Sequence, residues 1–119
     1  MKVVLTTETA SAAVVLKNQI IAAVRGELDD VKIDTWSYIK SGDGFDIVFH
    51  NPEQYTDEPE KNVLFRVEVE GSEVLFSTGW WKNKPMPEKE MLCLHTGRLT
   101  EMLLRYFSAK YIKFNVVDF

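Results

Sequence analysis

A regular alternation of apolar and polar residues on either side of Gly71-Ser72 constrains this chain more than any other feature. Apolar side chains occupy every second position from Val63 to Val69, and the alternation resumes from Val74 to Trp80 with Thr78 as its polar member. Gly71-Ser72 fits a two-residue hairpin turn with glycine in its first position. Because so short a loop fixes the register, we expect Val69 opposite Val74 and Val63 opposite Trp80 on one apolar face.

A second hairpin is predicted between residues 31 and 50, where β-branched and aromatic side chains flank a glycine-rich turn. A loop with an even number of residues would pair Trp36 with Phe49 and Tyr38 with Ile47. A loop with an odd number would turn Trp36 and Tyr38 to the other face, because strand side chains alternate. We expect the even register, since it gathers the most apolar surface on one face.

Helical spacing of apolar residues marks two further segments. The first runs from about Glu8 to Gly26, with Thr6 or Thr7 as its N-cap and Gly26 as its end. The second runs from Pro87 to about Ala109. The predicted buried stripes are Ala13, Leu16, Ile20 and Val24 in the first helix, and Leu92, Leu99, Met102, Leu103 and Tyr106 in the second, widened by Met91, Leu94 and Phe107.

The order of these elements predicts an α+β fold in one domain, residues 1–119. It comprises an N-terminal helix, a four-stranded antiparallel meander and a C-terminal helix. Short terminal strands at residues 1–6 and 111–119 are left open by the sequence.

Composition narrows the class of protein without defining an activity. The 119 residues are 45% hydrophobic and 27% charged, which is ordinary for a globular domain. The chain shows neither a signal-peptide pattern nor an apolar run of about 20 residues, so we expect no membrane attachment. A lone cysteine suits a reducing compartment. Because both a signal peptide and a membrane span are lacking, we expect a cytoplasmic protein from a bacterial or phage source.

Catalytic and metal-binding motifs are not recognisable, so we predict neither an enzyme nor a cofactor. Cys93 and His95 stand two apart on a helix and point in different directions. We interpret Cys93 as a small buried residue, His95 as a polar helix edge and Gly97 as a point of close backbone approach. His50 ends a strand beside an acidic loop, where a carboxylate–histidine site is the alternative to a merely structural role.

The segment from Trp80 to Lys84 is the strongest candidate for a binding surface. If Trp80 enters the core, alternation sends Trp81 outward beside Lys82 and Lys84, where it would anchor a protein partner. Two alternatives are open: a terminal strand or the second helix covers Trp81, or the strand ends at Trp80 and alternation no longer applies. The predicted partner-binding set is Trp81, Lys82 and Lys84, together with Asp57, Glu58 and Glu60 of the acidic loop.

We therefore expect a non-enzymatic module that blocks a protein partner sterically, as an inhibitor or an immunity-type protein would. One alternative is a small-molecule site, or a weakly marked enzyme, with a pocket between sheet and helices lined by Trp36, Tyr38, Trp80 and Tyr106. Another is binding of single-stranded nucleic acid through residues 81–84. The net charge of −4 disfavours nucleic acid, and homodimerisation through sheet edges is left open.

Overall fold

The computed structural model describes residues 1–31, 33–51 and 63–117, which form two α-helices and a six-stranded antiparallel sheet. The α+β class is confirmed, and residues 2–6 and 113–117 near the two ends are strands of the sheet. Along the sheet the strand order is β2-β3-β4-β5-β1-β6. The elements are β1 (Lys2–Thr6), α1 (Ala10–Val24), β2 (Trp36–Lys40), β3 (Asp46–His50), β4 (Leu64–Glu70), β5 (Glu73–Gly79), α2 (Lys89–Phe107), the 3₁₀-helix η2 (Ser108–Lys110) and β6 (Lys113–Val117).

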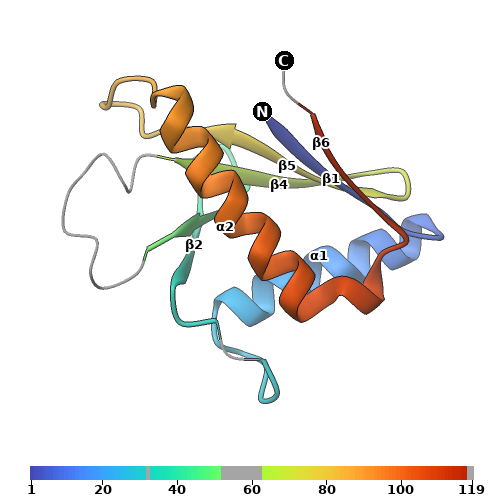
Figure 1. Cartoon of the computed structure of the whole chain (residues 1–119). Helices are drawn as coiled ribbons and strands as arrows, with labels where there is room; N and C mark the ends of the chain where they lie inside the picture. Colours follow the sequence, from blue (N-terminus) through green and yellow to red (C-terminus); the bar gives the residue numbers. More distant parts are fainter. Residues whose placement is uncertain (32, 52–62, 118–119) are drawn as a thin grey trace.

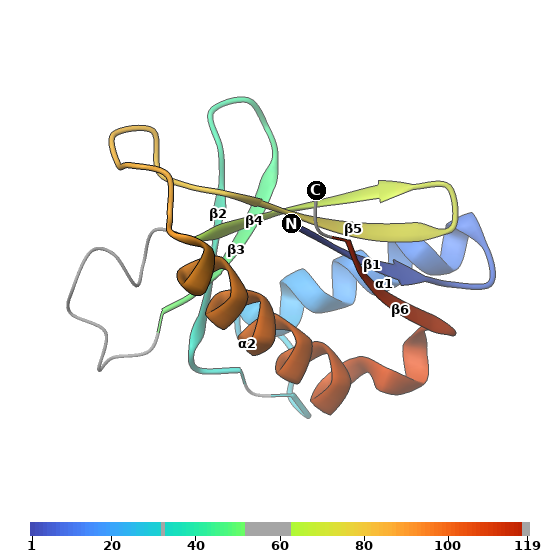
Figure 2. The ribbon, with the colours of Figure 1, turned by 45° about the horizontal axis from the view of Figure 1, so that its top comes forward.

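Both helices cover the same face of the sheet, as Figures 1 and 2 show. The core lies between these two layers. Val3, Phe65 and Phe76 from the sheet pack there with Leu16 of α1 and Leu99 of α2. Burial of large side chains on one sheet face and one stripe of each helix stabilises this two-layer arrangement.

The central β4–β5 hairpin has the predicted register, with Val69 paired to Val74 and Val67 to Phe76. Gly71 has a φ of +59°, as a glycine-first turn requires. The predicted pairing of Val63 with Trp80 is wrong, because β5 ends at Gly79. Trp80 consequently leaves the core and is 43% exposed.

The β2–β3 hairpin has the opposite register from the one we expected. Five residues, 41–45, form its loop, so Trp36 pairs with His50 and Tyr38 with Val48. The loop takes up Phe45, whose carbonyl accepts a hydrogen bond from the Ser41 amide at 2.9 Å. Trp36 still faces the helices and is 5% exposed. Its neighbours on that face are Val48 and His50, whereas Ile47 and Phe49 lie on the other face.

Helix α1 matches its predicted stripe, since Ala13, Leu16, Ile20 and Val24 are all buried. Its N-cap is Thr9, whose hydroxyl accepts a hydrogen bond from the Ala12 amide at 3.0 Å. The prediction of Thr6 or Thr7 was wrong because β1 and its continuation occupy these positions. The Thr7 hydroxyl donates to the Ser72 carbonyl at 2.7 Å and so ties this segment to the β4–β5 turn. Gly26, with a φ of +74°, follows the helix as expected.

Helix α2 buries a partly different set of side chains from the predicted one. Leu99, Met102, Leu103 and Phe107 are buried, with Tyr106 half-buried, but His95 is completely buried and Leu94 is exposed. Cys93 is exposed, so its interpretation as a buried residue was wrong. The positions of His95 and Cys93 are both the reverse of those we expected, and they have one cause. His95 packs towards the ring of His50, and because the two residues point in different directions on the helix, Cys93 faces outward.

Gly97 does not mark a close backbone approach. It is exposed, and an added Cβ there would have no neighbour within 4 Å. Among the described residues, neither helix is long and apolar enough to span a membrane.

Candidate functional site

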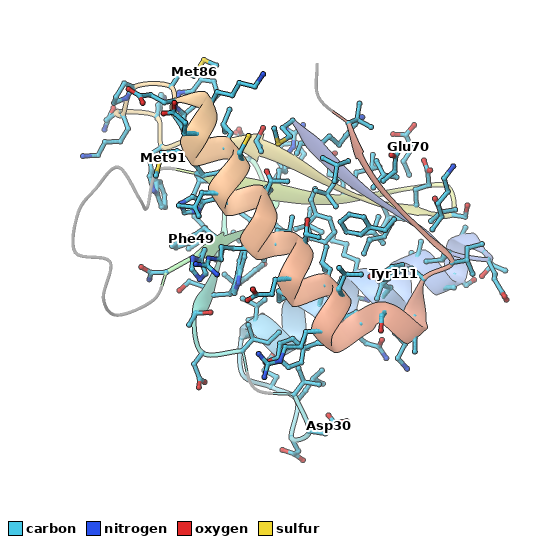
Figure 3. The ribbon with its side chains drawn as sticks, in the orientation of Figure 1. Asp30, Phe49, Glu70, Met86, Met91 and Tyr111 are labelled. Atoms are coloured by element: carbon cyan, nitrogen blue, oxygen red, sulfur yellow. The ribbon has the colours of Figure 1, made fainter. Side chains whose placement is uncertain are left out.

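Trp80 lies at the junction between β5 and the connector that leads to α2. It lines two hollows: one of about 300 Å³ with Ile47, Leu64 and Gly79, and one of about 430 Å³ with Met86 and other residues near the start of α2. Met86 is 65% exposed and lies in the connector before α2 (Figure 3). We call Trp80, Met86 and these two hollows the Trp80 surface.

Trp81, the predicted anchor, is less exposed than Trp80. Its ring meets that of Phe49 edge to face, with the centroids 5.7 Å apart. Trp81 therefore covers the apolar outer side of β3. The exposed tryptophan that we sought is its neighbour, because the strand ends before Trp80 and alternation no longer decides which ring enters the core.

Lys82 and Lys84 belong to the same connector as the two tryptophans. Lys82 is exposed, and the Lys84 amide closes a turn by donating to the Trp81 carbonyl at 3.0 Å. Residues 80–89 hold three lysines and one glutamate, so the Trp80 surface has a basic border on an acidic protein. The other predicted site residues, Asp57, Glu58 and Glu60, lie outside the described residues.

A third hollow lies between α2 and the chain segment that enters β2. Its volume is about 290 Å³. The lining side chains come from two walls: Ile33, Asp34, Thr35, Trp36 and His50 on the sheet side, and Arg98, Glu101, Met102, Arg105 and Tyr106 on α2. We call this hollow the α2 cleft.

His50 forms the inner end of the α2 cleft and is 7% exposed. Its ring centroid lies 5.3 Å from that of Trp36 and 6.0 Å from that of His95. Burial lowers the pKa of His50 to about 4, with further lowering by His95 and Arg98 and an opposing effect of Glu101. At neutral pH the imidazole is therefore uncharged.

The charged residues of the α2 cleft stand at its border and are exposed. Arg98 Nη1 lies 3.7 Å from Glu101 Oε2, so these two charges largely offset each other. The Arg105 guanidinium stacks over the ring of Tyr106, 5.4 Å from its centroid. No ion pair joins Arg105 or Asp34 to another residue in the described part of the chain.

Of the pocket residues that the sequence suggested, the structure brings Trp36 and Tyr106 together in the α2 cleft. Tyr38 lines a different, shallow depression beside Arg25, and Trp80 belongs to the Trp80 surface. Sequence reasoning missed Arg98 and Arg105, although their spacing of seven on a helix places them on one side. Over residues 1–31, 33–51 and 63–117, no three histidine, cysteine or acidic side chains are grouped to hold a metal ion.

Comparison with known proteins yields no relative: no family model matches the chain, and neither does any curated protein or solved structure. The geometry of the two surfaces is therefore the basis for a proposal about function.

Proposed function

We propose that this protein is a non-enzymatic module that binds another protein through the Trp80 surface and blocks it sterically, as an inhibitor or immunity-type protein does. The observation that carries the proposal is the exposed Trp80 side chain set between two hollows. Tryptophan is favoured at the centre of protein interfaces because it buries a large area with few rotatable bonds.

The shape of the Trp80 surface suits a partner that supplies apolar side chains on both sides of the ring. Leu64 and Ile47 line the hollow on the outer sheet face, and Met86 lines the hollow towards α2. Lys82 and Lys84 would meet acidic groups of the partner at the border, where charges steer association more than they add affinity. In this proposal Trp80 replaces Trp81 as the anchor, while Asp57, Glu58 and Glu60 would attract a basic region of the same partner.

The proposal is tested with Trp80→Ala in an affinity pull-down from host lysate, followed by calorimetric titration of the protein that wild type retains. Loss of a central tryptophan costs about 2 kcal/mol or more, which is a roughly thirty-fold weaker Kd. We expect an unchanged Tm, because an exposed ring contributes little to folding.

Leu104→Ala is the matched control, since Leu104 is an equally exposed apolar residue on α2. It should bind the partner as tightly as wild type. Full binding by Trp80→Ala, or the absence of any retained protein, would contradict the proposal.

A further inference from the structure

The α2 cleft has a charge arrangement that the Trp80 surface does not share. Each of its two walls carries an exposed charged side chain that forms no ion pair with another described residue: Arg105 on α2 and Asp34 on the segment before β2. The Arg98–Glu101 pair adds no net charge between them. A ligand that fills the cleft therefore meets a cation from one wall and an anion from the other.

Apolar side chains form the floor of the cleft. Ile33, Trp36 and Met102 are all buried members of the core, so their positions are set by packing and do not depend on a ligand. Such a floor favours an apolar or aromatic group. The volume of about 290 Å³ is just below the usual range of small-molecule sites, which suits a ligand of about the size of a single residue.

From this arrangement we propose that the α2 cleft binds a free α-amino acid with an apolar side chain. The ligand carboxylate would accept a pair of hydrogen bonds from the N–H groups of Arg105, and the ligand ammonium group would donate a hydrogen bond to the Asp34 carboxylate. The side chain would lie on Trp36 and Met102. This inference is independent of the proposed protein-binding function, which uses other residues.

The same charges disfavour the neighbouring ligand classes. Two carboxylates and two guanidinium groups line the cleft, so it offers no net attraction to a dianion such as a phosphate ester or to a simple amine. The buried His50 adds no charge at neutral pH, so it does not shift this balance.

The decisive experiment is calorimetric titration of the whole protein with L-leucine, L-methionine and L-phenylalanine. L-leucinamide lacks the carboxylate and N-acetyl-L-leucine lacks the ammonium charge, so each removes one expected contact. We expect at least one amino acid to bind, and its amide and N-acetyl forms to bind at least tenfold more weakly.

Two variants assign the contacts. Arg105→Gln should weaken binding of the amino acid about tenfold and remove its advantage over the amide. Asp34→Asn should also weaken binding of the amino acid about tenfold, and it should remove the advantage of the amino acid over its N-acetyl form. Lys113→Gln, on the exposed edge strand β6, is the control and should bind as wild type does.

Three results would overturn the inference. The first is that none of the three amino acids binds at about 10 mM, which excludes Kd values near 1 mM. The second is that an amino acid and its amide bind equally. The third is that both cleft variants bind the amino acid as wild type does. Trp80→Ala should bind the amino acid normally, so failure of this inference and failure of the protein-binding proposal are distinguishable.

Discussion

The two hairpins of the sheet are held in register by different means. In β4–β5 a two-residue turn joins strands whose helix-facing residues are nearly all apolar, with Val67 opposite Phe76 and Val69 opposite Val74. In β2–β3 a five-residue loop joins strands that contain polar groups facing the helices. There Asp46 accepts hydrogen bonds from Tyr38 Oη at 2.5 Å and from Lys17 Nζ of α1 at 2.8 Å.

The difference shows that one hairpin is specified locally and the other by tertiary contacts. The β4–β5 register follows from residues close together in the sequence, because the two-residue turn fixes which residues of the two strands pair. The β2–β3 register depends on Lys17 from α1 and on the packing of His50 near His95 of α2. The predictions below test whether this contrast is energetic as well as geometric.

Acid should affect the β2–β3 hairpin most. His50 has a pKa of about 4 in the folded protein and about 6.5 when unfolded. Because the unfolded state takes up a proton first, stability is fully present above pH 6.5 and falls as the pH drops towards 4. The loss is up to about 3 kcal/mol, from 1.36 kcal/mol per unit of pKa difference. Urea unfolding at several pH values measures it.

The comparison variant for this effect is His50→Leu, which cannot titrate. The difference in unfolding free energy between wild type and His50→Leu should change by that amount between pH 7 and pH 4. A difference that stays constant over this range would show that the charge state of His50 does not matter to the hairpin. Asp46 titrates below this window, since the bonds from Lys17 and Tyr38 outweigh its burial and hold its pKa below 3.8.

Asp46→Asn should weaken the attachment of the hairpin to α1. Loss of a charged acceptor for Lys17 and Tyr38 costs about 1–2 kcal/mol, because hydrogen bonds to charged groups are stronger than neutral ones. Chemical denaturation measures the loss. Glu27→Gln is the control, because the Arg25–Glu27 pair is about half exposed and should contribute close to nothing. Equal losses in the two variants would remove the special role of Asp46.

The smallest effect is expected in the locally specified hairpin. Gly71→Ala places a side chain at a positive φ and should lower stability by about 1 kcal/mol. Gly42→Ala, in the longer loop and at an ordinary φ, should be nearly neutral. Thermal unfolding compares them. A larger loss at Gly42 than at Gly71 would reverse our account of which turn sets its register.

The sequence allowed the helices, the α+β class and the β4–β5 register to be predicted, because these depend on local periodicity. The register of β2–β3 could not be predicted in this way. We counted Phe45 as a strand residue because this register gave the larger apolar face. The face that packs against the helices instead contains His50, a polar residue that is buried against His95 of α2.

The candidate sites were predictable only in outline. The segment containing Trp80 and Trp81 was identified, but which ring is exposed depends on the last residue of β5, a boundary that no pattern marks. The α2 cleft requires Asp34 and Arg105 to lie on facing walls. That arrangement depends on how α2 crosses the sheet (Figure 1), which periodicity does not report.

The position of β1 inside the sheet has a consequence for how the chain is made. β1 is synthesised before the other five strands, yet it pairs with β5 on one side and β6 on the other. Its two partners leave the ribosome only after α1 and the strands β2, β3 and β4. Until then Val3 and Leu5 remain without the strands that bury them, so the growing chain needs protection from aggregation. Pairing between such distant segments also makes folding slow, because long loops must close before the contacts form.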